Sequence, residues 1–69
     1  MTLADKCKYA RKRLKLTQRE FGAIIGTNQT EISFIERGFT PEDARKIARA
    51  DALYNAATYE ERRRGNERG

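Results

Sequence analysis

Histidine is absent from the 69-residue sequence, and cysteine and proline occur once each. With Cys7 alone and no histidine, the chain can form neither a Cys/His zinc site nor an internal disulfide. The sequence also lacks paired catalytic carboxylates and a phosphate-cradling glycine loop. We therefore expect a protein that is not an enzyme and uses no metal or cofactor, with Cys7 as a small buried core residue.

Long apolar stretches are missing too. No run approaches the ~20 residues of a membrane helix, and lysines follow the N-terminal residues 2–5, where a signal peptide would have an apolar segment. We therefore expect a cytoplasmic protein with no membrane contact and no small-molecule ligand. At this length only ~60% of the unfolded surface can be buried, so we expect compact helix packing or a partner subunit to support the fold.

Positive charge, by contrast, is in excess. Fifteen lysines and arginines oppose ten acidic residues, which gives a net charge of +5. Residues 1–15 contribute six of the cations and only one carboxylate, Asp5. A small basic domain suits a polyanionic partner, although solvated basic helices are common and charge alone does not select a function.

Helix-start and helix-stop signals recur along the chain and predict an all-α fold. Thr17 to Glu20 and Asn28 to Glu31 have capping-box spacing, and the pair Thr2 and Asp5 is a fainter case. After Thr40, Pro41 suits the first position of a helix, and Asp43, three residues after Thr40, gives a weaker version of the capping box. Gly26 and Gly38 can end helices in the left-handed conformation. The signals predict helices over residues 3–14, 18–25, 29–37 and 41–56.

Apolar spacing predicts one core formed by all four helices. The predicted core residues are Leu3, Cys7, Ala10, Leu14, Phe21, Ile24, Ile25, Ile32, Ile35, Ala44, Ile47, Ala48 and Leu53. We expect residues 1–57 to form the domain. Residues 58–69 are highly charged, and we expect a frayed turn followed by a disordered tail, in which Arg62, Arg63 and Arg64 are candidate phosphate contacts.

The segment 17–38 is the most informative. It predicts two helices of about eight residues joined by a turn at Gly26, where glycine accepts a positive φ at no steric cost. Gly22 lies inside the first of these helices, where glycine costs ~1 kcal/mol relative to alanine. We expect that the second helix crosses close over Gly22, which would make the pair a helix-turn-helix.

The residues from Leu16 to Gly38 resemble the motif of the XRE family, which includes the lambdoid phage repressors and Cro proteins. The resemblance runs from about Leu3 to Ala48 and is strongest in Leu-Thr-Gln at 16–18 and in Ile-Glu-Arg-Gly at 35–38. It implies a lambda-repressor-like domain of four to five short helices. Asp51 stands where the family's fourth helix usually has an apolar residue, and no fifth helix is evident.

The start of the third helix enters the major groove of DNA in this family. The resemblance implies that Gln29, Thr30 and Phe34 read base edges, and Ser33 falls on the same side of the helix. Glutamine can bond adenine, and threonine can bond a base or touch a thymine methyl. Phe34 has a second interpretation, packing against Phe39 across a Schellman motif.

Glu31 also has two interpretations: it either completes the capping box or accepts a hydrogen bond from cytosine N4. The resemblance places Gln18 against the DNA backbone, where exposed amides at a helix start suit a phosphate. The candidate backbone contacts are Thr17, Gln18, Asn28, Arg37, Arg19 and Lys15, with Lys8, Lys12 and Arg13 as further cations. The resemblance also implies a partly buried, structural salt bridge between Arg11 and Glu36.

These observations predict a sequence-specific, nucleoid-associated transcriptional regulator, namely a Cro-like phage or plasmid repressor. We expect it to bind a pseudo-palindromic operator in double-stranded DNA as a homodimer. Leu53, Tyr54 and Tyr59 are the candidate dimer contacts; alternatively, they fold back and complete the core. Other interpretations are an antitoxin, a plasmid copy-control protein, or a protein-interaction module that has lost DNA binding. The polar, uncharged start of the third helix argues against the last, because protein partners favour larger apolar patches.

Overall fold

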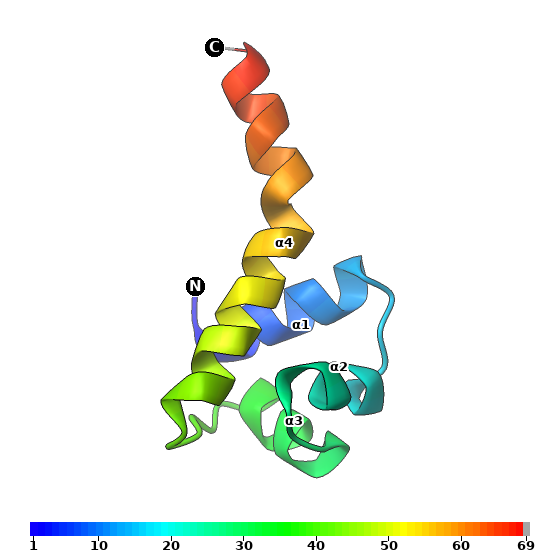
Figure 1. The fold of residues 1–69 in the computed structure, drawn as a ribbon, viewed down its shortest axis with the longest axis vertical. Helices are drawn as coiled ribbons and strands as arrows, with labels where there is room; N and C mark the ends of the chain where they lie inside the picture. Colours follow the sequence, from blue (N-terminus) through cyan, green and yellow to red (C-terminus); the bar gives the residue numbers. More distant parts are fainter. Residues whose placement is uncertain (69) are drawn as a thin grey trace.

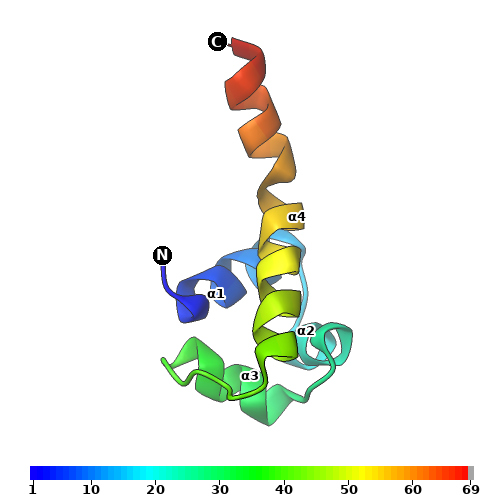
Figure 2. The ribbon, with the colours of Figure 1, turned by 60° about the vertical axis from the view of Figure 1, so that its left-hand side comes forward.

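The computed structural model describes residues 1–68, without the side chains of residues 60 and 62–68. It contains four helices and, within those residues, no strand: α1 (Leu3–Arg13), α2 (Gln18–Ile25), α3 (Gln29–Glu36) and α4 (Ala44–Arg68). The first three helices surround the lower half of α4, and its upper half extends away from them (Figures 1 and 2). The predicted all-α fold is confirmed. None of the described helices is long and apolar enough to cross a membrane.

Local capping starts the first two helices as predicted. The Thr17 hydroxyl accepts the Glu20 N–H at 3.0 Å, and the Glu20 carboxylate accepts the Thr17 N–H at 2.9 Å. Thr2 and Asp5 form the same reciprocal pair at 3.1 and 3.4 Å. Hydrogen bonds from Thr17 hold the pKa of the Glu20 carboxyl below its ordinary value. Both boxes therefore satisfy amides that the helix itself leaves without a partner.

Only half of the box predicted for α3 is present. The Asn28 side-chain oxygen accepts the Glu31 N–H at 2.9 Å, so Asn28 is the N-cap. The Glu31 carboxylate does not bond back to Asn28; it accepts hydrogen bonds from Thr27 and from Lys46 of α4. The predicted capping role of Glu31 is wrong, because the Thr27 hydroxyl and the Lys46 ammonium bind its carboxylate in place of the Asn28 N–H.

Both predicted ends of the fourth helix are wrong. Pro41 is buried in the loop before the helix, and Asp43 caps it by accepting the Arg45 N–H at 2.9 Å. The helix then runs beyond residue 56 to Arg68, through the segment expected to be a disordered tail. Glu61 on this extension accepts a hydrogen bond from the Tyr9 hydroxyl at 2.5 Å, which ties it to α1. Gly69 and the side chains of Arg62, Arg63 and Arg64 lie outside the described residues, so their phosphate contacts stay a prediction.

A Schellman motif ends α3 one residue before the predicted end. The Phe39 N–H bonds to the Phe34 carbonyl at 3.0 Å and the Gly38 N–H to the Ile35 carbonyl at 3.0 Å. Gly38 has a φ of 114°, which glycine adopts without strain.

The same motif ends α1, but with a lysine at the left-handed position. The Leu16 N–H bonds to the Arg11 carbonyl at 2.8 Å and the Lys15 N–H to the Lys12 carbonyl at 3.2 Å. Lys15 has a φ of 57°, and it is the one described non-glycine residue with a positive φ. This conformation costs an L-residue roughly 1–2 kcal/mol. The backbone at Lys15, in the turn between α1 and α2, is therefore strained.

The core lies where α1, α2 and α3 meet the lower half of α4. Its buried apolar residues are Cys7, Ala10, Phe21, Ile25, Ile32, Ile35, Ala50 and Ala57. Four predicted core residues are instead exposed: Leu14, Ile24, Ala44 and Ala48. Leu14 lies beyond the end of α1. Of the neighbouring Ile24 and Ile25, Ile25 alone faces the core, and the buried apolar residues of α4 are Ala50 and Ala57.

Cys7 is fully buried, as predicted, and burial raises the pKa of its thiol to about 11, with smaller contributions from Glu36 and Asp51. The thiol therefore stays protonated at neutral pH.

Long-range polar contacts join α1 to α4; we call Lys6, Tyr9, Asp51, Tyr54 and Glu61 the α1–α4 seam. Lys6 Nζ lies 3.0 Å from Asp51 Oδ1 and 5.7 Å from the centre of the Tyr54 ring. The Tyr9 and Tyr54 rings meet edge to face with centroids 5.9 Å apart. Asp51, which replaces an apolar residue of the family pattern, therefore has an ionic partner on α1.

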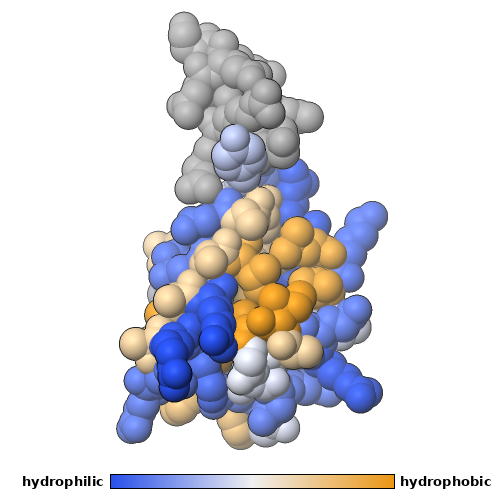
Figure 3. All heavy atoms as spheres, viewed as in Figure 1, coloured by the Kyte–Doolittle hydropathy of each residue, from blue (hydrophilic) through white to orange (hydrophobic). Residues whose placement is uncertain are grey.

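Apolar residues also gather at the surface beside α4, at the level of α1 (Figure 3). Several large apolar residues remain exposed in the structure; Leu14 is 40% exposed and Ile24 is 52% exposed. The described helices leave this part of the surface uncovered.

Candidate nucleic-acid interface

The turn between α2 and α3 brings the two helices into backbone contact. A Cβ on Gly22 would lie 2.9 Å from the carbonyl carbon of Asn28, closer than real side chains approach backbone. The Thr27 N–H bonds to the Gly22 carbonyl at 2.7 Å, and Gly26 has a φ of 86°. The close approach predicted at Gly22 is confirmed, although the residue preceding α3 makes the contact. The helix-turn-helix therefore depends on glycine at two positions.

Helix α4 also contacts this turn. Arg49 Nη1 donates to the carbonyl of Ile25 at 3.3 Å, at the C-terminus of α2. A Cβ on Gly26 would lie 2.6 Å from the same nitrogen. A cation at a helix C-terminus stabilises the last carbonyls. Sequence reasoning missed this role of Arg49, and the one available signal was that the last turn of α2 contains no basic residue of its own.

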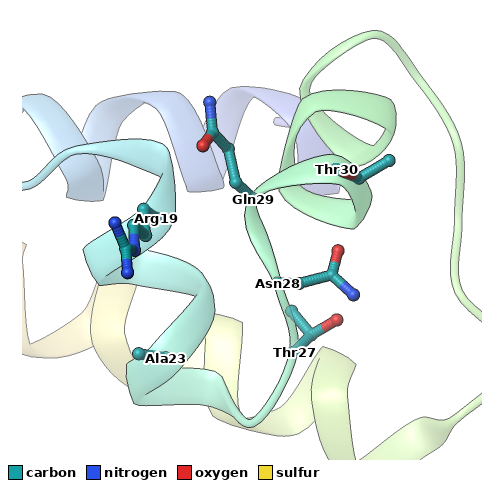
Figure 4. A pocket seen from close by; sticks show the side chains of 6 residues that line it. All are labelled: Arg19, Ala23, Thr27, Asn28, Gln29 and Thr30. Atoms are coloured by element: carbon teal, nitrogen blue, oxygen red, sulfur yellow. The ribbon is translucent and has the colours of Figure 1, made fainter.

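The start of α3 presents polar side chains to solvent. Gln29 and Thr30 are exposed and Ser33 is half-buried. Among the described residues, no hydrogen bond holds the side chain of Gln29 or Thr30. Figure 4 shows Arg19 on α2 and Gln29 and Thr30 at the start of α3 around a shallow hollow. These side chains are therefore available to an external partner; we call Gln29, Thr30 and Ser33 the recognition surface.

A second hollow adjoins the first and contains residues predicted to contact the DNA backbone. It is lined by Arg11, Thr17, Gln18, Arg19 and Gln29. The structure thus brings the start of α2 and the start of α3 to one side of the molecule. Cations beside the N-termini of two helices make this side favourable for phosphate groups.

The candidate backbone contacts differ in whether their side chains already have a partner within the protein. Lys15, Arg19 and Arg37 are exposed, whereas Thr17 and Asn28 already act as caps through their side-chain oxygens. The Gln18 amide nitrogen lies 3.5 Å from a Glu36 oxygen. A phosphate contact by Gln18 would therefore compete with an internal hydrogen bond.

Phe34 keeps both of its interpretations. Its backbone takes part in the Schellman motif, and 47% of the residue is exposed, compared with 50% for Phe39. The Arg37 guanidinium lies 4.8 Å from the centre of the Phe34 ring. The same guanidinium donates through Nε to the Ser33 carbonyl at 3.3 Å. The ring can still touch a thymine methyl, with a cation beside it.

Arg11 of α1 and Glu36 at the end of α3 form an ion pair. Arg11 Nε lies 2.7 Å from Glu36 Oε2, and Arg11 Nη2 lies 3.0 Å from Glu36 Oε1. The Glu36 side chain is 7% exposed. The bond to Glu36 raises the pKa of Arg11 above its ordinary value. This two-pronged ion pair fixes α3 against α1.

The three candidate dimer contacts differ in burial. Leu53 and Tyr54 pack against the core, and the Tyr54 ring contacts Tyr9. Tyr59 is 56% exposed. The alternative in which these residues complete the core therefore applies to the first two, and Tyr59 alone keeps most of its surface.

A family model described as Helix-turn-helix matches residues 8–52, from α1 into α4. The match covers well over half of the chain, so the chain belongs to the XRE-type helix-turn-helix family of DNA-binding regulators. The family resemblance found in the sequence is confirmed. Searches of curated proteins and of solved structures returned no match.

Proposed function

We propose that the protein is a Cro-like repressor of phage or plasmid type, which blocks transcription by occupying a pseudo-palindromic operator as a homodimer. Gln29 and Thr30 are the proposed base readers, with Ser33 and Phe34 beside them in the major groove. Cations at positions 15, 19 and 37 are proposed to contact phosphates and to set the register of the helix.

The observation that supports this function best is that Gln29 and Thr30 of the recognition surface are exposed and that their side chains make no hydrogen bond within the described part of the chain. An amide and a hydroxyl at a helix start match the hydrogen-bonding edges of bases in the major groove. The Arg11–Glu36 pair and the Gly22 contact support the same interpretation, since both hold α3 rigidly while its outer side stays open.

A dimer is proposed because a single domain of this size offers a small DNA interface, and two copies double it. Half-sites one helical turn apart, about 34 Å, would place two copies on one side of the duplex. The proposed contact between the copies lies on α4, where Tyr59 keeps 56% of its surface exposed. We expect weak self-association in solution that strengthens on DNA.

Footprinting on DNA that flanks the protein's own gene tests the repressor proposal. The expected result is protection of two half-sites related by a two-fold axis. Sedimentation of the protected duplex with the protein should then give two chains per duplex at saturation. One chain per duplex with a single protected half-site would contradict the dimer, and absence of salt-dependent binding to any duplex would favour a protein-interaction module.

A further inference from the structure

Glu31 is held by a contact that its own helix does not supply. Its Oε1 accepts the Thr27 hydroxyl at 2.6 Å and the Lys46 ammonium at 2.9 Å. The Glu31 and Lys46 side chains are about a quarter exposed, at 25% and 26%. Because Lys46 belongs to α4, a tertiary contact turns the carboxylate toward α4.

The position of Glu31 makes this orientation relevant to DNA recognition. Glu31 follows Thr30 directly, and successive helical residues are rotated by about 100°. Its side chain therefore starts at the flank of the recognition surface. A carboxylate released there could accept a hydrogen bond from cytosine N4, and its charge would repel nearby phosphates.

We propose that Lys46 is a specificity-determining residue. Together with Thr27 it holds the Glu31 carboxylate toward α4, and so keeps a hydrogen-bond acceptor for cytosine N4 away from the recognition surface. Lys46 is a positioning residue, since it acts through Glu31. The inference rests on the proposed function, because it takes the start of α3 to be the part that reads bases.

Loss of Lys46 would leave Glu31 with one of its two partners, Thr27, and with the nearby negative charge of Asp43. The Thr27 hydroxyl would still donate to the carboxylate. Hydrogen bonds from Thr27 and Lys46 hold the pKa of the Glu31 carboxyl below its ordinary value, and like-charge repulsion from Asp43 opposes them more weakly. Without the ammonium, the carboxylate loses its bond to α4, and rotamers that turn toward the DNA compete with the Thr27 hydrogen bond alone.

The turn has other supports, so a variant at position 46 is expected to fold. The Asn28 cap on Glu31 N–H, the Arg49 bond to the Ile25 carbonyl and the backbone contact at Gly22 do not involve Lys46. A partly exposed ion pair of this kind contributes little to stability. A change in base preference can therefore be measured on folded protein.

The experiment selects bound duplexes from a pool with randomised sequence, using the unchanged protein and the variants Lys46→Met, Glu31→Gln and Lys46→Met with Glu31→Gln. We expect Lys46→Met to gain a preference for cytosine at one position of each half-site, by about tenfold over the other bases. Glu31→Gln and the double variant should show a much weaker cytosine preference, because a neutral amide oxygen accepts a weaker hydrogen bond than a carboxylate and the amide group also suits adenine. Lys46→Arg keeps the ion pair and should select the same sequences as the unchanged protein.

Two outcomes would overturn the inference while leaving the proposed function intact. One is a Lys46→Met variant that binds DNA with unchanged base preferences. The other is a Glu31→Gln variant that loses a cytosine preference present in the unchanged protein, since Glu31 would then already read a base. If the unchanged protein selects no sequence from the pool, the proposed function fails and the inference fails with it.

Discussion

The start of α3 and the α1–α4 seam are both rich in polar side chains, but they use them differently. At the start of α3, Gln29 and Thr30 are exposed and make no side-chain hydrogen bond within the described part of the chain. Along the seam, Lys6 pairs with Asp51, and Tyr9 donates to Glu61. Polar groups that already have partners are used for structure, and those without internal partners remain available for a ligand.

The two regions also differ in where their partners lie along the chain. The caps of α2 and α3 join residues three positions apart. The seam joins residues 45 and 52 positions apart. Stability and recognition should therefore respond separately to mutation, and four substitutions test this separation.

The largest expected effect is on stability, at the ion pair that fixes α3 to α1. Glu36→Ala would leave the Arg11 guanidinium partly buried without its carboxylate, so we expect a loss of about 3–5 kcal/mol in the free energy of unfolding. Chemical denaturation measures this loss. The matched control is Asp51→Ala, which breaks the more exposed Lys6–Asp51 pair and should cost about 1 kcal/mol or less. Equal losses for both variants would contradict the burial of the Glu36 pair.

The next effect concerns the contact beneath the α2–α3 turn. Gly22→Ala would place a methyl group against the backbone of Asn28, and we expect overpacking to destabilise the fold by roughly 1–3 kcal/mol. Helix propensity alone predicts the opposite sign, a gain of about 1 kcal/mol. Thermal denaturation therefore decides between the two by the direction of the shift in Tm. A raised Tm would mean that α3 does not approach α2 as closely as described.

A third substitution should change recognition and leave stability alone. Gln29→Ala removes a proposed base contact, so we expect operator affinity to fall by about 1–3 kcal/mol, with little change on random DNA. Titration of both duplexes at one salt concentration gives the two affinities, and denaturation should show unchanged stability. An equal loss on both duplexes would assign Gln29 to the phosphate backbone.

The smallest effect is expected at the strained turn after α1. Lys15→Gly relieves the positive φ and should stabilise the fold by about 0.5–1 kcal/mol. If Lys15 contacts a phosphate, the same change should reduce the slope of log affinity against log salt by about one. Lys12→Gly, in the last helical turn of α1, is the control for the stability measurement alone and should destabilise by up to about 1 kcal/mol. Unchanged salt dependence would remove Lys15 from the DNA interface.

Several features of the recognition unit were predictable because their causes are local in the sequence. Capping side chains at Thr17 and Asn28, apolar spacing through Phe21 and Ile32, and the glycine at the turn are all set by neighbours within a few residues. The Arg11–Glu36 pair was predictable only because the sequence resembles a family in which it occurs.

The remaining features required the tertiary structure, since distant residues decide between local alternatives. The sequence allowed Glu31 to complete its capping box, and Lys46 of α4 draws the carboxylate away. The charged segment after residue 57 suggested a disordered tail, yet Tyr9 of α1 contacts Glu61 on a helix that continues to Arg68. Short-range steric and capping preferences therefore determined where α1, α2 and α3 begin, whereas long-range hydrogen bonds and ion pairs tie α4 to α1 as far as Glu61 and decide where the Glu31 carboxylate points.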